Sequence, residues 1–428
     1  MTRAGRIVIW IVGAAAFTGA AALTFSHGSE GAPGRLAPYR FPIAAPGDLE
    51  GEIRSLEARV SRDPSGALDR AALASLLLKK ARASSDAGDF RAARDRARQS
   101  LDLLPNDNPG ALMTLAGIAE AGHDFAEASR LAREVLKQRP GHPEALALGV
   151  TAGLGVGAWD DALRAAEELS DRLPTMGSRT LLALALESRG RDLEAGHAYR
   201  AAIAAEDLGE AEGSAWARAL FARHFMRLGG LSEARDLLNE ALRIVPEHPQ
   251  ALGLLAELEA GEGQAEVAVG LYARAYGQTR DPHFLVDWAV TVAARGHRGE
   301  AETRFREAED RLRKEIAAGE FGHRGELAHL LLHRGRPEDL PEALDLARDE
   351  ARRRRDLETL ENLAWALSRS GQWREARAAV LEALASGARR PDLYRRAAEI
   401  ERALGNVTRA RAFEVAAASV TRPPASSP

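Results

Sequence analysis

Residues Gly371–Leu384 read Gly-Gln-Trp-Arg-Glu-Ala-Arg-Ala-Ala-Val-Leu-Glu-Ala-Leu. The stretch opens with a glycine and then places Ala376, Val380, Ala383 and Leu384 at positions i, i+4, i+7 and i+8. That spacing gathers side chains on one face of a helix. The sequence therefore predicts a turn followed by an amphipathic helix.

This pattern recurs ten times, each time with an alanine at the same helical position: Ala93, Ala128, Ala162, Ala195, Ala234, Ala268, Ala301, Ala343, Ala376 and Ala410. Successive alanines are 35, 34, 33, 39, 34, 33, 42, 33 and 34 residues apart. In most copies a glycine lies five residues earlier: Gly88, Gly157, Gly190, Gly229, Gly263, Gly296, Gly371 and Gly405. A period held this constant predicts one repetitive body, although the length alone would suit about three domains.

A second small residue lies twelve positions before most of these alanines: Ala81, Ala116, Ala183, Ala222, Ala256, Ala289, Ala364 and Ala398. Small residues on both helices of a hairpin let the helices approach closely, and glycine allows the tight turn between them. A single hairpin cannot bury its own apolar stripe, so neighbouring hairpins must stack. The two long spacings predict longer loops near 206–214 and 336–340.

The small–glycine–aromatic–alanine order, closed by proline in four units, resembles the tetratricopeptide repeat (TPR) family. The resemblance covers about residues 65–424. It implies an all-α, right-handed superhelical solenoid of about ten helix-turn-helix repeats. It also implies a concave groove, lined by the first helix of each repeat, that binds a peptide or an extended segment of a partner.

The same alignment places a set of mostly apolar side chains in that groove: Leu78, Met113, Leu154, Leu184, Arg223, Met226, Val286, Val290 and Trp365. Such a lining suits apolar side chains of a partner protein. An alternative stays open at this point, because the next repeat can bury several of these residues instead.

The N-terminus predicts export. Arg3 and Arg6 precede Ile7–Phe25, an uncharged run that would span roughly 28 Å as a helix. Residues 1–25 are therefore expected to be a signal peptide or a signal anchor, with the question of cleavage open. Either fate puts the rest of the chain outside the cytoplasm, as a periplasmic or secreted protein or one held to the inner membrane by residues 7–25.

The flanks of the repeat region are short. Residues 26–47 are rich in Gly, Pro and Ser and predict a flexible linker. Residues 48–64 predict a capping helix that begins at Asp48 and ends before Pro64. The solenoid is expected over 65–424, and residues 425–428 are expected to form a disordered tail.

Composition and motifs argue against catalysis. The chain has no cysteine, which excludes disulfides, thiolate zinc ligands and a thiol nucleophile. Its net charge of −4 gives no reason to expect nucleic acid binding. The glycines of 153–157 follow no strand and precede no Lys-Ser/Thr pair, so they predict no nucleotide site. We expect no enzyme activity and no cofactor.

Two further clusters of polar residues suggest alternative functions. Glu326, His329 and His333 fall on one face of a predicted helix and define an alternative function, a metal-binding protein or metal-dependent enzyme. Arg352–Arg355 is interpreted as a solvated helix face, with an acidic partner or anionic lipid as the alternative.

The first hypothesis is a non-enzymatic scaffold or adaptor of the cell envelope that binds a partner protein in its groove. A self-associating structural module is the other alternative, and the oligomeric state is open.

Overall fold

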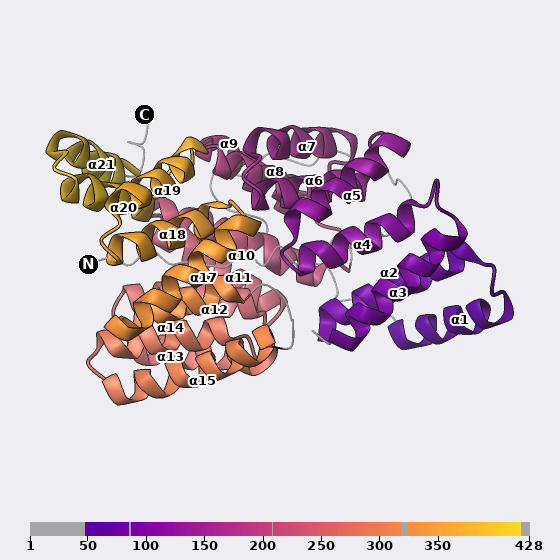
Figure 1. Cartoon of the computed structure of the whole chain (residues 1–428), viewed down its shortest axis with the longest axis horizontal. Coiled ribbons are helices and arrows are strands. Elements are labelled where there is room, and N and C mark those ends of the chain that lie inside the picture. Colours follow the sequence, from indigo (N-terminus) through magenta and orange to yellow (C-terminus); the bar gives the residue numbers. More distant parts are fainter. Residues whose placement is uncertain (1–47, 85–86, 208, 318–322, 421–428) are drawn as a thin grey trace.

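The computed structural model describes residues 48–84, 87–207, 209–317 and 323–420. These residues form α-helices and one short 3-10 helix, and no strand occurs among them (Figure 1). No helix in this part of the chain is long and apolar enough to cross a membrane. The predicted leader (1–25), linker (26–47) and tail (425–428) lie outside the described residues.

After α1 (Leu49–Arg62), the helices pair into ten hairpins. The first helices of the hairpins, here called A helices, are α2 (Ala67–Ser84), α4 (Pro109–Ala121), α6 (Pro143–Gly155), α8 (Met176–Ser188), α10 (Ala211–Leu228), α12 (Pro249–Gly261), α14 (Pro282–Ala294), α16 (Arg324–Arg334), α18 (Leu357–Arg369) and α20 (Pro391–Ala403). The second, or B, helices are α3 (Ala87–Leu103), α5 (Phe125–Gln138), α7 (Trp159–Arg172), α9 (Asp192–Ala204), α11 (Leu231–Ile244), α13 (Ala265–Thr279), α15 (Arg298–Ala317), α17 (Leu340–Arg353), α19 (Trp373–Ala385) and α21 (Val407–Val420). The all-α prediction of ten stacked hairpins is confirmed for the described residues.

The small residues lie where helices cross. All ten repeat alanines are at most 3% exposed, and so are the small residues that face them from the A helices. The fit is tight at Gly153 of α6, where an added Cβ would lie 3.0 Å from the Cβ of Ala162 in α7. Larger side chains here would force the hairpin apart.

The turns follow the predicted register with one exception. Seven of the eight predicted turn glycines have φ between 69° and 86°, and His123 takes the same place with φ of 56°. Gly88 instead lies inside α3, near its start, so its assignment as a turn glycine was wrong. The helix begins earlier in this first repeat than the alignment implied.

The two long spacings are not only loops. The first lengthens the connection between α9 and α10 and also lengthens α10 itself to 18 residues. The second adds the 3-10 helix η1 (Pro337–Asp339) and lengthens α15 to 20 residues. Extending a helix keeps its backbone hydrogen-bonded, so an insertion need not become irregular chain.

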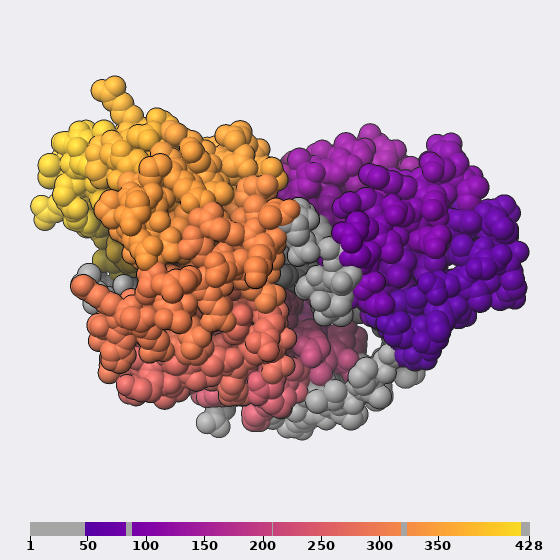
Figure 2. All heavy atoms as spheres, turned by 60° about the horizontal axis from the view of Figure 1, so that its bottom comes forward, coloured from indigo at the N-terminus to yellow at the C-terminus, as the bar shows by residue number. Residues whose placement is uncertain are grey.

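The solenoid curves until its later repeats touch earlier ones, while its terminal helices α1 and α21 lie at opposite sides of the molecule (Figure 1). Substantial contacts between helices join only elements that are adjacent or next-adjacent along the chain. Loops of the C-terminal repeats nevertheless reach turns of the N-terminal repeats, so that α19 lies beside α9 (Figure 1). In the space-filling view the indigo-to-magenta repeats and the orange repeats touch along one edge (Figure 2).

Candidate functional site: an inter-turn contact and an inner wall

The first place where the chain meets itself is called here the Arg354 patch (His123, Phe125, Gly155, Arg354 and Arg355). The backbone N–H of Arg355 donates to the carbonyl of Gly155 at 2.8 Å. The Arg354 guanidinium lies 3.1 Å from Nδ1 of His123 and 5.4 Å from the centre of the Phe125 ring. The loop between α17 and α18 therefore docks on the end of α6 and the start of α5.

This patch explains two stretches that the sequence interpretation assigned elsewhere. A Cβ on Gly155 would lie 2.4 Å from the Phe125 ring, and one on Gly157 would lie 3.1 Å from the carbonyl of Arg355. The glycines of this stretch thus allow the Phe125 ring and the backbone of Arg355 to approach closely. The solvated-face interpretation of Arg352–Arg355 holds for the exposed Arg352 and Arg353, but it was wrong for Arg354, whose side chain is 11% exposed.

The second place is called the Gly190 patch (Arg189, Gly190, Asp192, Arg227, Ser386, Gly387 and Arg389). The guanidinium of Arg189 donates to the carbonyl of Ser386. A Cβ on Gly190 would lie 2.2 Å from the carbonyl oxygen of Gly387. In return, a Cβ on Gly387 would lie 3.0 Å from the carbonyl oxygen of Arg189. Two backbones touch here with no side chain between them.

Charges behind the Gly190 patch hold Arg227 in place. Its Nη1 donates to the carbonyl of Arg389 at 2.9 Å, and its Nη2 lies 2.7 Å from Asp192 and 3.4 Å from Glu187. Burial raises the pKa of Glu187, but the hydrogen bond with His224 and the charge of Arg227 outweigh it and lower the pKa to about 2. Glu187 is therefore ionised and anchors the guanidinium.

Three successive A helices line the inside of the closed turn. They carry mainly polar and aromatic residues: His283, Asp287 and Val290 on α14; Glu326, His329 and His333 on α16; Glu358, Asn362 and Trp365 on α18. Asp287, Glu326 and Asn362 occupy one common repeat position, and Val290, His329 and Trp365 occupy another. We call this surface the inner wall. Glu326 lines a small pocket together with Arg354, and Arg354 lies 3.1 Å from His123 across the turn, so the wall adjoins the Arg354 patch.

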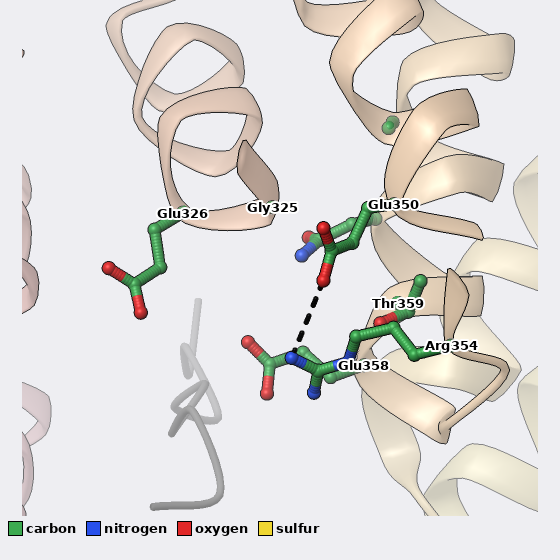
Figure 3. Close-up of a pocket in the computed structure, with 8 residues that line it drawn as sticks. Gly325, Glu326, Glu350, Arg354, Glu358 and Thr359 are labelled. Carbon is green, nitrogen blue, oxygen red and sulfur yellow. Dashed lines mark ion pairs between the residues drawn. The ribbon is translucent and has the colours of Figure 1, made fainter. Parts of the chain in front are cut away.

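A small pocket lies where the inner wall meets the Arg354 patch. Figure 3 shows Glu326 on one side of it and Glu350, Arg354 and Glu358 on the other. Its volume of about 20 Å³ has room for about one water molecule. The pocket is therefore part of a buried ionic arrangement and does not offer space for a small-molecule substrate.

The pKa values of Glu350 in the pocket, and of Asp287 and His323 on neighbouring elements, lie away from their usual range. Burial raises the pKa of Glu350 to about 7 despite the nearby Arg354, and burial also raises the pKa of Asp287 to about 6. Burial lowers the pKa of His323, but Glu326 and Glu315 outweigh it and raise that pKa to about 9. Glu350 beside the pocket and Asp287 on the wall thus ionise closer to neutral pH than ordinary carboxyls.

Glu350→Gln should make stability less dependent on pH. The raised pKa means that the folded chain holds this proton up to about pH 7, whereas the unfolded chain loses it near the ordinary glutamate pKa of 4.5. The contribution of this carboxyl to the free energy of unfolding is fully present below the unfolded pKa. It is lost as pH rises from the unfolded pKa through the folded pKa, by at most about 1.4 kcal/mol per pH unit. Urea unfolding of wild type and variant from pH 5 to pH 8 measures the difference.

The glutamine variant should gain relative stability as pH rises. The charged groups that act on Glu350 are present in both proteins, so the comparison isolates the ionisation of Glu350 itself. These groups are Arg353, Arg354, Asp356 and Glu326. A constant difference between the two proteins across this range would contradict the assignment.

The structure divides the predicted groove residues into two groups. Leu78, Leu154, Leu184 and Val286 are 3–7% exposed and belong to the apolar core, so they pack neighbouring repeats. The others remain partly exposed: Met113, Arg223, Met226, Val290 and Trp365. The sequence analysis did not assign the polar residues of the inner wall to the groove. Their helical spacing along three A helices was the signal that could have placed them there.

Trp365 lies in an aromatic group on that wall. The rings of His333 and His329 lie 4.8 and 6.0 Å from its ring, both edge-on. The guanidinium of Arg396, from α20, lies 5.3 Å from the same ring. Stacked rings and a cation over an indole face form a rigid amphipathic surface.

The metal-site alternative finds no support in this geometry. Glu326 pairs with His323 at 3.0 Å, and Nδ1 of His329 lies 3.3 Å from Oδ1 of Asn362. The described residues contain no group of three or more His, Asp or Glu side chains arranged to hold a metal ion. Glu326, His329 and His333 therefore make an ion pair, a polar contact and aromatic contacts on this helical face.

Comparison with known proteins identifies the repeat. The tetratricopeptide repeat family model matches residues 220–283 and 362–426. Both segments consist of the hairpins described above, with alanines at their crossings. These two segments are tetratricopeptide repeats.

The chain is similar to two curated proteins named cellulose synthase operon protein C. The one from Pseudomonas fluorescens (strain SBW25) is 30% identical over 276 residues, which cover 58% of this chain and 21% of that protein. The one from Xanthomonas axonopodis pv. citri (strain 306) is 30% identical over 199 residues, covering 44% and 13% respectively. The chain thus spans a minor part of the length of either relative.

Among solved structures, the chain is similar to a human IFIT1 dimer with PPP-AAAA and to a human IFIT1 dimer with m7Gppp-AAAA. Each is 15% identical, covers 88% of this chain and has a TM-score of 0.48. They cover 95% and 96% of the respective IFIT1 chains. At these values neither supports an inference about ligands.

Proposed function

We propose that this protein is a non-catalytic scaffold that binds an extended segment of a partner protein along its inner wall. The proposal rests on the observation that each A helix has two kinds of position, one buried between hairpins and one partly exposed. Alanine and leucine positions bury the hairpins, whereas His329, His333 and Trp365 stay partly exposed on the wall. Aromatic residues with polar edges are typical of surfaces that bind protein segments.

The chemistry of the wall indicates the kind of segment. Trp365 and the imidazoles beside it offer apolar faces, and the charges nearby, Asp287, Glu326, Glu358 and Arg396, are of both signs. A segment with an apolar or aromatic anchor flanked by polar residues fits this surface. The near-balanced charge of the whole chain gives no attraction for nucleic acid, so a protein partner is preferred.

We propose further that the scaffold acts in the cell envelope. Arg3 and Arg6 before the apolar run Ile7–Phe25 support export, and the similarity to proteins named for the cellulose synthase operon is compatible with a place among envelope assemblies. Fractionation of cells that express the chain with and without residues 1–25 tests this part. Equal amounts of both forms in the cytoplasm would contradict it.

Photo-crosslinking in cells should capture a partner through the inner wall. A photoreactive amino acid in place of Trp365 is expected to give a discrete adduct of fixed mass that His333→Ala weakens several-fold. Lys314, on the B helix α15, is the matched control and should give none. The groove assignment is wrong if the position at Lys314 crosslinks and the position at Trp365 does not.

A further inference from the structure

We propose that the inter-turn contact is a latch: the solenoid parts at the Gly190 patch, and the partly exposed inner wall becomes more accessible to a partner. The proposal goes beyond partner binding because it concerns how the wall becomes accessible. It rests on the proposed function only for the identity of the ligand, a segment of a partner protein that binds the inner wall. The geometry of closure stands on its own.

The closed state is built from matched features of two distant segments. Arg189 and Ser386 are separated by 197 residues, yet a guanidinium and a carbonyl meet there. Glycine stands on both sides of the closest approach, at Gly190 and Gly387, and each would clash with the other backbone if it carried a Cβ. Because both turns require positive φ as well, two separate constraints favour glycine at each position.

The latch can open without unfolding either side. One apolar core runs from Leu146 to Phe284 and holds α8, α9 and α10, while another runs from Leu285 to Ile400 and holds α19 and α20. The two cores share partly buried residues, among them Tyr276 and Trp288, half-way round the turn. Across the Gly190 patch, by contrast, they share none among the described residues.

The bonds that close the Gly190 patch are of a kind that water replaces readily. They are hydrogen bonds from Arg189 and Arg227 to backbone carbonyls and an ion pair between Asp192 and Arg389 at 3.5 Å. Polar groups of this kind recover most of their interactions in solvent, whereas separating two helices exposes apolar surface. Opening is therefore expected at the polar loops, and not between stacked hairpins.

Gly190→Ala tests the latch against a matched control, Gly371→Ala. Both glycines occupy the same turn position, with φ of +69° and +71°, so the added methyl strains both backbones alike. Only at Gly190 does the methyl meet the opposite turn, because nothing lies within 4 Å of the Cβ position at Gly371. The difference between the two variants isolates the contact across the turn.

The absence of cysteine allows spin labels at two chosen positions. Glu194→Cys on α9 and Arg395→Cys on α20 report the distance across the Gly190 patch by pulsed electron spin resonance. We expect one narrow, short distance in the otherwise native chain and in Gly371→Ala, and a longer, broader distribution in Gly190→Ala. Equal distributions in the two alanine variants would overturn the latch.

A second readout tests admission to the wall. Val290→Cys, labelled with a polymer-linked maleimide, should react several-fold faster in Gly190→Ala than in Gly371→Ala. Unchanged reactivity alongside a longer spin–spin distance would overturn the gating role. Arg189→Ala should act in the same direction as Gly190→Ala, since it removes a donor of the patch without straining a turn. Neither readout needs a partner, so failure of the crosslinking experiment at Trp365 leaves this test intact.

Discussion

Arg218→Ala is expected to lower the free energy of unfolding by about 3–5 kcal/mol. Arg218 is fully buried in α10 and pairs with Glu206 and Glu240, whose side chains are 8% and 10% exposed. It also donates to the hydroxyl of Ser214. Removing the guanidinium leaves two carboxylates in a low-dielectric interior without a cation, which costs more than the pair contributes when intact.

Arg313→Ala is the matched control for this prediction. Arg313 also joins two carboxylates, Glu309 and Glu342, but it lies on the surface with 44% of its side chain exposed. Exposed pairs contribute about 0–1 kcal/mol, so the control should unfold in nearly the same urea concentration as wild type. A loss in Arg218→Ala no greater than in Arg313→Ala would show that the interior around α10 is hydrated.

Ala376→Leu is expected to destabilise the fold by about 1–3 kcal/mol through overpacking. Ala376 has no exposed surface and lies in α19, which packs on α18 at a crossing where Ala364 is also fully buried. Three added carbons have no space between the helices, so the hairpin must separate or the side chain must leave its preferred rotamer.

The control for Ala376→Leu lies two residues away in the same helix. Ala378 is exposed, so Ala378→Leu adds the same carbons at nearly the same helix propensity without touching the crossing. Its urea midpoint should stay close to that of wild type. Similar midpoints for the two leucine variants would mean that Ala376 does not set the distance between helices.

The fold was predictable because its determinants repeat. Ala376 alone fits many helices, but ten alanines at nearly equal spacing define a common crossing, and each is buried. Local irregularities were less predictable. The insertion before Ala343 lengthened α15, because a helix absorbs extra residues without losing backbone hydrogen bonds.

The closure of the turn was not predictable from the sequence. Arg189 and Ser386 come together only because small rotations accumulate over the repeats that separate them, and no local pattern encodes that sum. One signal was present. Gly155 is a glycine that the repeat does not require, and the structure shows a phenylalanine ring and the returning chain against it.

Small-angle X-ray scattering of the native chain tests the closed solenoid most directly. The account predicts that the profile calculated from the described residues, with the Gly190 and Arg354 patches in contact, accounts for the measured curve of the folded repeats. A curve that requires an open, extended superhelix, with Gly190 far from Gly387 in the unliganded protein, would contradict it.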